Sequence, residues 1–156
     1  MVIVYAVKGF DGANLLLDNP LQVPAHRYSG RVLASGKEAV RTTPKFERVR
    51  LLGDVVFVSG TAAIKGEDSE FSEDTRVQAL GAIDVVEHLV APSNISPNCS
   101  ALRVYVRRPQ DLEPVREMFI SHFRDAPIHF LQADICRPEL LLELEGVGRA
   151  LPFLRP

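Results

Sequence analysis

Two glutamates near the end of the chain have the spacing that most clearly points to chemistry. In the stretch from Leu140 to Gly146 (LLLELEG), leucines alternate with residues that include Glu143 and Glu145. In a β-strand this alternation places three leucines on the core face and both glutamates on the opposite face. Burying a carboxylate without a partner costs several kcal/mol, so these two side chains need water, a cation or a ligand nearby.

Glu143 is the candidate catalytic residue. An apolar pocket raises the pKa of a carboxyl group, and a glutamate that keeps its proton near neutral pH can protonate the carbon of an enol ether, enamine or imine. The structural alternative is that Glu143 forms half of a salt bridge between subunits. Glu145 lies on the same face, and we expect it to be a structural neighbour or one whose titration is coupled to that of Glu143.

Four polar residues around this stretch are candidates for binding a substrate. Arg107 and Arg137 could each bind a carboxylate, because a guanidinium group donates two parallel hydrogen bonds to it. The alternative for an exposed arginine is simple solvation. Glu139 lies close to Arg137 in the chain, where a surface ion pair is the competing interpretation. Gln132 could donate a hydrogen bond to a substrate or to a neighbouring strand.

A run of small residues earlier in the chain forms a second candidate region. Ser59, Gly60 and Thr61 follow an apolar segment, and a glycine backbone there can approach a ligand or another chain closely. We therefore count Ser59 and Thr61 among the candidate binding residues.

Hydrophobic periodicity predicts the elements that position these residues. Gly53-Asp54 joins two apolar runs as in a β-hairpin. Ser72 is the predicted N-cap of a helix that ends before Pro92, with Leu80 and Leu89 supporting its buried stripe. The predicted strands are 1–8, 46–52, 55–63, 101–106, 128–136 and 140–146, and the predicted helices are 74–91 and 111–123.

This order predicts an α+β fold with a single mixed sheet of about six strands and two helices on one face. The other face would then expose apolar residues such as Phe57, Leu131 and Leu141. Association with copies of the same chain would bury them. We divide the chain into an N-terminal strand and irregular extension of the same domain (1–44), the main domain (45–150) and a tail (151–156).

Composition limits the classes of partner. The chain has 156 residues and a formal net charge of −2, so it has no basic field for nucleic acid. No apolar run approaches the ~20 residues of a membrane span, and the first residues resemble a strand rather than a secretory leader. We therefore expect a cytoplasmic protein that binds a small carboxylate metabolite. The two cysteines and four histidines lack metal-ligand spacing, so neither a metal nor a cofactor is expected.

Four segments in order carry a resemblance to a known family. VVFVSGTAAI (55–64), DTRVQALGAIDVVEHLV (74–90), RVYVRRPQD (103–111) and LLLELEG (140–146) resemble the RidA/YjgF family. The pair FVSGTA and ADICRPELLLELEG is most similar to the C-terminal half of the chorismatases, also labelled pteridine-dependent dioxygenase-like proteins. The resemblance implies a chorismate-mutase-like homotrimer with ligand clefts between subunits, and it places the family's acidic residue at Glu143.

The resemblance also bears on the reaction. Chorismatases hydrolyse the enolpyruvyl ether of chorismate, whereas many RidA proteins deaminate enamines and imines. Where the deaminases carry an arginine that binds the substrate carboxylate, this chain has His129. His129 could be a weaker anion ligand or a packed core residue. We therefore expect acid-assisted hydrolysis of a small unsaturated carboxylate. The alternatives are a RidA-type deaminase and a non-catalytic, metabolite-binding trimer.

Overall fold

The structure is a computed structural model that describes residues 8–30, 45–70, 73–91 and 101–150. Within these ranges the strands are β1 (Asn14–Leu17), β2 (Val49–Leu52), β3 (Val55–Thr61), β4 (Ile64–Lys65), β5 (Asp68–Ser69), β6 (Ala101–Val106), β7 (Ile128–Gln132) and β8 (Leu142–Arg149). The helices are α2 (Thr75–Val90) and α3 (Leu112–His122), with short 3-10 turns η1 (Ala25–Arg27) and η4 (Pro109–Asp111).

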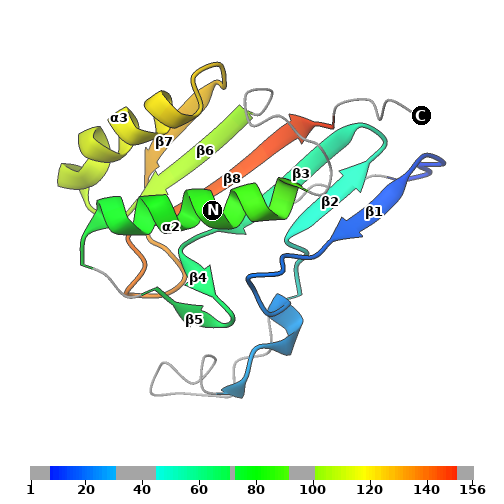
Figure 1. The fold of residues 1–156 in the computed structure, drawn as a ribbon, viewed down its shortest axis with the longest axis horizontal. Helices are drawn as coiled ribbons and strands as arrows, with labels where there is room; N and C mark the ends of the chain where they lie inside the picture. Colours follow the sequence, from blue (N-terminus) through cyan, green and yellow to red (C-terminus); the bar gives the residue numbers. More distant parts are fainter. Residues whose placement is uncertain (1–7, 31–44, 71–72, 92–100, 151–156) are drawn as a thin grey trace.

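Six strands form one mixed sheet in the order β1-β2-β3-β8-β6-β7 (Figure 1). All neighbouring pairs are antiparallel except β6 and β7, which are parallel and are connected through α3. Strands β4 and β5 form a separate two-stranded ribbon. The strand β8, which comes last in the sequence, thus lies in the middle of the sheet between β3 and β6.

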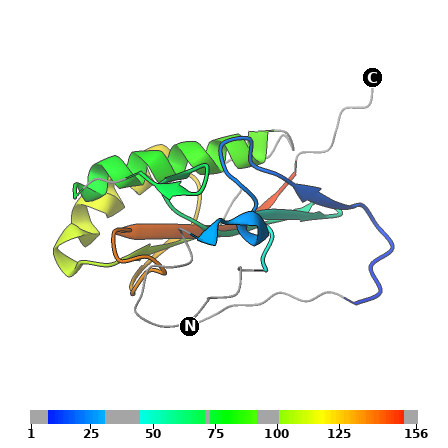
Figure 2. The same ribbon diagram turned by 90° about the horizontal axis from the view of Figure 1, so that it is seen from below.

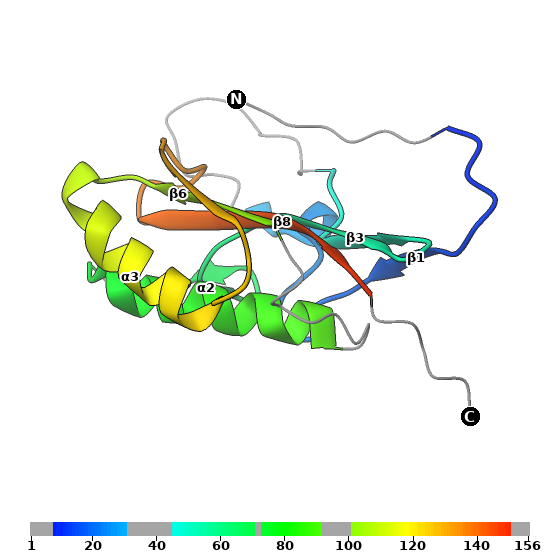
Figure 3. The ribbon, with the colours of Figure 1, turned by 90° about the horizontal axis from the view of Figure 1, so that it is seen from above.

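Both helices cover the same face of the sheet. Figures 2 and 3 show α2 and α3 together on one side of the strands. The core lies between these layers, where Leu142 and Leu144 of β8 and Phe119 of α3 are fully buried. This arrangement confirms the predicted α+β class, with six strands and two helices on one face. It also leaves the opposite face of β8, which carries Glu143 and Glu145, uncovered by either helix.

Several local predictions are confirmed. The hairpin of β2 and β3 turns at Gly53, whose φ of 63° belongs to the left-handed region that glycine adopts without strain. The strand predicted at 101–106 has these bounds as β6. The predicted strand 1–8 lies outside the described residues, apart from its last residue.

Other local predictions were wrong. The N-cap of α2 is Asp74, whose side chain accepts a hydrogen bond from the backbone N–H of Arg76 at 2.8 Å, so the cap is not Ser72. Leu80 is 60% exposed rather than part of the buried stripe, and Gln78 is buried instead. The reason is tertiary: Gln78 bonds to the backbone of Glu139 and Leu141 and so ties α2 to the connection before β8. That connection is longer than predicted, because β7 ends at Gln132 and not at residue 136. Strand β8 begins two residues later than predicted, at Leu142, and continues past residue 146 to Arg149.

Candidate active site

Strand register gathers polar residues into two rows on the sheet face opposite the helices. In one row Arg103 of β6 pairs with His129 of β7 and with Glu145 of β8. In the next row on that face, Tyr105 of β6 pairs with Glu143. The alternate residues of β6 and β8 are buried against the helices. The pleat therefore fixes which side chains face away from the core.

Glu145 contacts two polar side chains of β6. Its Oε1 lies 2.8 Å from Nη1 of Arg103 and accepts a hydrogen bond of 2.6 Å from the hydroxyl of Tyr105. Burial, helped by this hydrogen bond to Glu145, raises the pKa of the Tyr105 hydroxyl, so it remains a donor at neutral pH. A cation and a hydroxyl donor thus contact the same carboxylate oxygen of Glu145.

Glu143 has the opposite environment. It is partly buried and, within the described part of the chain, takes part in no ion pair or hydrogen bond. Burial first, and the charge of Glu145 second, raise the pKa of the Glu143 carboxyl, while the charge of Arg48 partly offsets both. Glu145 is thus paired with a cation and a hydroxyl donor, whereas Glu143, two residues away, lies in surroundings that raise its pKa. A carboxyl group with a raised pKa is suited to donating a proton.

Gly60 provides the space that Glu143 occupies. A Cβ atom at position 60 would overlap the carboxyl group, lying 2.8 Å from Cδ of Glu143. The register of β3 against β8 shifts between Val58 and Thr61, as at a β-bulge or a similar irregularity. Bulges often occur beside active sites because they change where a side chain points. Here the register shift and the missing side chain let the carboxyl group lie against the β3 backbone.

Arg48 is a residue of this region that the sequence analysis did not single out. It is only 6% exposed, and its Nη2 donates to the hydroxyl of Tyr28. Its guanidinium carbon lies 5.7 Å from the ring centre of Tyr28 and 4.9 Å from that of Phe46. A signal was present in the sequence: alternation against Val49 and Leu51 places Arg48 on the face of Glu143 once the hairpin pairs with β8.

The connection between β7 and β8 carries three further polar residues, Cys136, Arg137 and Glu139. Nη1 of Arg137 donates to the backbone oxygen of Glu67 and to Oγ of Ser69, at 2.8 and 3.0 Å. Its guanidinium carbon lies 5.3 Å from the ring centre of Tyr28. Glu139 accepts a hydrogen bond from Ser69 rather than pairing with Arg137. Surrounding protein and the charge of Glu143 raise the pKa of the Cys136 thiol, which therefore stays protonated.

Arg107 has a structural position. It donates to the backbone oxygens of Ile135, Arg137 and Leu140 and forms an ion pair of 2.9 Å with Asp134. These contacts hold the β7–β8 connection in shape. Arg107 thereby positions the neighbours of Glu143 while its own donors are occupied.

The remaining candidates are spread over the region. Oγ of Ser59 donates to the backbone oxygen of Glu47, and the buried Thr61 donates to the backbone oxygen of Ser59. His129 is exposed and lines a shallow hollow with Arg103 and Glu145, one row away from Glu143. Gln132 is exposed at the end of β7. Arg137 shares the ring of Tyr28 with Arg48, whose charge acts on Glu143.

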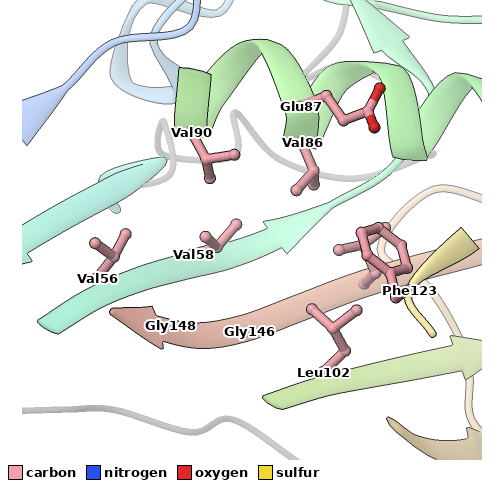
Figure 4. A pocket seen from close by; sticks show the side chains of 10 residues that line it. Val56, Val58, Val86, Glu87, Val90, Leu102, Phe123, Gly146 and Gly148 are labelled. Atoms are coloured by element: carbon pink, nitrogen blue, oxygen red, sulfur yellow. The ribbon is translucent and has the colours of Figure 1, made fainter. Parts of the chain in front are cut away.

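A separate apolar gap lies on the helix side of the sheet. Figure 4 shows Val86 and Val90 of α2 above β3 and β8, where Gly146 and Gly148 carry no side chain to fill the space. Because it lies on the face opposite Glu143 and is lined almost entirely by apolar groups, it has no part in the acid chemistry. In the described ranges, no three histidine, cysteine or carboxylate side chains gather as metal ligands. No described helix has the length and apolar character of a membrane span.

Comparisons with known proteins find curated relatives of similar sequence. The chain is 35% identical over 162 residues to a 3-hydroxybenzoate synthase from Streptomyces hygroscopicus, covering 92% of this chain and 46% of that enzyme. It is 29% identical to a chorismatase from the same organism, covering 87% of this chain and 42% of that enzyme. The chain thus spans about half the length of the curated relatives it matches. No protein-family model matches it.

Solved structures give the same result for the fold. A crystal structure of chorismatase superposes with a TM-score of 0.71 at 25% identity, covering 88% of this chain and 44% of that one. A YjgF-family protein from Neisseria meningitidis superposes with a TM-score of 0.60 at 17% identity, covering 70% of this chain and 91% of that one. With its mixed six-stranded sheet and two helices on one face, the chain has a RidA/YjgF-like fold that is related to the fold of chorismatase.

Proposed function

We propose that the site around Glu143 hydrolyses the enol ether of a small unsaturated carboxylate, as chorismatases do. The observation that carries this proposal is a partly buried Glu143 whose carboxyl has a raised pKa, beside a Glu145 that pairs with Arg103 and Tyr105. Hydrolysis of an enol ether begins with proton transfer to carbon, which needs a carboxylic acid that is still protonated near neutral pH.

The chemistry assigns Glu143 two successive roles. Its proton passes to the terminal methylene carbon of the enol ether, and the electron pair of the double bond forms the new C–H bond. The resulting oxocarbenium ion accepts water, and the Glu143 carboxylate removes a proton from that water. The hemiketal hydroxyl then loses its proton as the C–O bond breaks, and the departing oxygen takes up a proton, which gives a 2-oxo acid and an alcohol. The proton returned to Glu143 restores the starting state, so no cofactor is consumed.

The relatives support the same reaction class. The names of the two Streptomyces hygroscopicus relatives refer to a chorismatase and a 3-hydroxybenzoate synthase, and chorismate carries an enolpyruvyl ether. Glu143 and its surroundings lie within the half of those enzymes that this chain matches. The proposed substrate and the proposed activity therefore rest on the chemistry of the site and on the similarity to these relatives.

The proposed assembly is a homotrimer with the site in a cleft between subunits. Leu131 is 38% exposed on the sheet face opposite the helices, where Phe57 is partly buried. Leu141, expected on that exposed face, is buried within the chain instead. The face therefore combines apolar residues with the charged pair Arg103 and Glu145, a composition that suits an interface surrounding a polar cleft.

The direct test is to incubate the purified protein with chorismate and to measure the release of pyruvate and of the ring product. An enamine such as 2-aminoacrylate, assayed for ammonia release, serves as the competing substrate. The proposal predicts pyruvate release without ammonia release. Turnover of the enamine with no turnover of chorismate or other enolpyruvyl ethers would contradict it.

A further inference from the structure

Arg48 is a buried cation with unmet hydrogen-bonding capacity. Only 6% of its surface is exposed, and its Nε is buried without a hydrogen-bond partner. None of the ion pairs among the described residues includes it. Its contacts with Tyr28 and Phe46 are cation–π contacts, which are weak beside the cost of burying an unpaired charge.

Arg137 repeats this pattern beside the same aromatic ring. Its Nη1 is bonded to Glu67 and Ser69, but its Nη2 is buried and has no hydrogen-bond partner. The two guanidinium carbons lie 5.7 Å and 5.3 Å from the ring centre of Tyr28. Two cations around one ring repel each other, and each holds an unsatisfied donor. An anion that accepts from both would remove both penalties.

The position of Arg48 relates this pair of cations to the proposed acid. The charge of Arg48 acts on the Glu143 carboxyl, yet the two groups are not within ion-pair distance. Glu143 therefore stays available as an acid while a cation lies near it. A substrate whose carboxylate is a few bonds from its reactive carbon could contact both groups at once.

We infer that Arg48 and Arg137, arranged around Tyr28, form a carboxylate-binding site next to Glu143, and that this site recognises the acid group of the substrate. The inference rests on the proposed function for the identity of the reacting carbon, but the binding step is separable from the chemistry. Nη2 of Arg48 donates to the Tyr28 hydroxyl, so Tyr28 orients the guanidinium and leaves Nε for the ligand. The site takes over the task that the sequence resemblance would give to position 129.

The test uses 3-hydroxybenzoate as the probe and 3-hydroxybenzyl alcohol as its uncharged counterpart, both titrated calorimetrically against the full chain. The wild-type protein should bind the carboxylate and should bind the alcohol about 10- to 100-fold more weakly, as expected for loss of a charge-assisted contact. Arg48→Gln should weaken carboxylate binding by a similar factor. Arg50→Gln removes a cation from the same strand that pairs with Glu47, and it should leave binding unchanged.

Because Arg48 is buried, Arg48→Lys provides a variant that keeps the charge if Arg48→Gln does not fold. Lysine lacks the Nε donor and the planar guanidinium group. Arg48→Lys should therefore weaken binding of the carboxylate by a larger factor than binding of the alcohol. Equal binding of acid and alcohol by the wild type, no binding of the acid at millimolar concentration, or unchanged carboxylate binding by a folded Arg48 variant would overturn the inference.

A Glu143→Gln variant separates this inference from the proposed reaction. If Glu143→Gln binds the probe normally but has lost turnover, both claims stand. Normal turnover in Glu143→Gln with weakened binding in the Arg48 variants would reject the reaction and keep the binding site. Normal binding in the Arg48 variants with lost turnover in Glu143→Gln would reject the binding site and keep the reaction.

Discussion

The carboxyl group of Glu143 lies against the backbone of Gly60, at a place where a methyl group would come within 2.8 Å of its Cδ. The contact joins β8 to the register shift in β3. A side chain at position 60 would push the carboxyl group out of this space, so the position of the proposed acid depends on a residue that has no side chain.

Gly60→Ala should therefore reduce activity more than stability. The overlapping atoms belong to the far end of a flexible glutamate side chain, which can rotate away at little energetic expense. We expect turnover to fall by at least about tenfold, because a small displacement of a catalytic group has a large effect on rate, while the melting temperature changes little. Gly30→Ala is the matched control, since a Cβ atom there meets open space. Unchanged turnover in Gly60→Ala would show that Glu143 does not act from this position.

Glu145→Gln should shift the pH dependence of turnover toward acid. The negative charge of Glu145 contributes to the raised pKa of Glu143, so removing that charge lets Glu143 lose its proton at a lower pH. Because the protonated form is the active one, the high-pH limb of the rate profile should move to lower pH. The exposed helix residue Glu117, changed to Gln, is the control and should leave the profile in place. A limb that stays fixed or moves upward would contradict the assignment.

Glu143→Gln should stabilise the fold near neutral pH. Its carboxyl has a raised pKa in the folded protein and an ordinary pKa when unfolded. Below the ordinary range, near pH 4, both states are protonated and Glu143 has no net effect. As the pH rises through the raised pKa, the folded protein loses stability, and glutamine avoids this loss.

Urea unfolding at a series of pH values measures this difference directly. The free energy of unfolding of Glu143→Gln should exceed that of the wild type at neutral pH, and the difference should vanish in acid. A salt-bridge role for Glu143 predicts the reverse, with a less stable variant at neutral pH because its partner cation would be left unpaired.

The oligomeric state tests the proposed cleft between subunits. Sedimentation equilibrium at micromolar concentration should give about three times the chain mass of 17.3 kDa. Replacing the exposed Leu131 by Glu should weaken the assembly, because it places a charge on the apolar part of the face opposite the helices. The matched change of Leu80, which is exposed on α2, should not. A wild-type protein that stays monomeric would rule out the inter-subunit site.

Much of the fold followed from periodicity. The hairpin at Gly53-Asp54 and the strand at Ala101–Val106 depend on local alternation and turn chemistry, and these are features that a sequence shows directly. The N-cap of α2 could not be predicted from the sequence, because Ser72 and Asp74 are both good capping residues. Only the structure shows that Asp74 accepts a hydrogen bond from the backbone N–H of Arg76.

The site was partly predictable for a related reason. Glu143 stood out because a carboxylate in an apolar strand is unusual, and its role as the acid stays a prediction. Arg48 and Gly60 could not be ranked from sequence, because their importance depends on strands that pair across more than 80 positions of the chain. Arg107 had the right chemistry for a ligand, yet three backbone oxygens occupy it.

The most direct test of the account is the rate of pyruvate release from chorismate by Glu143→Gln, measured beside the wild type and the control Glu117→Gln. Glutamine keeps the shape of the side chain but has no transferable proton. The account predicts a loss of roughly 10²- to 10⁴-fold in rate, with the fold and probe binding retained, and wild-type rates for the control. A folded Glu143→Gln protein that releases pyruvate at the wild-type rate would contradict the role of Glu143 as the acid.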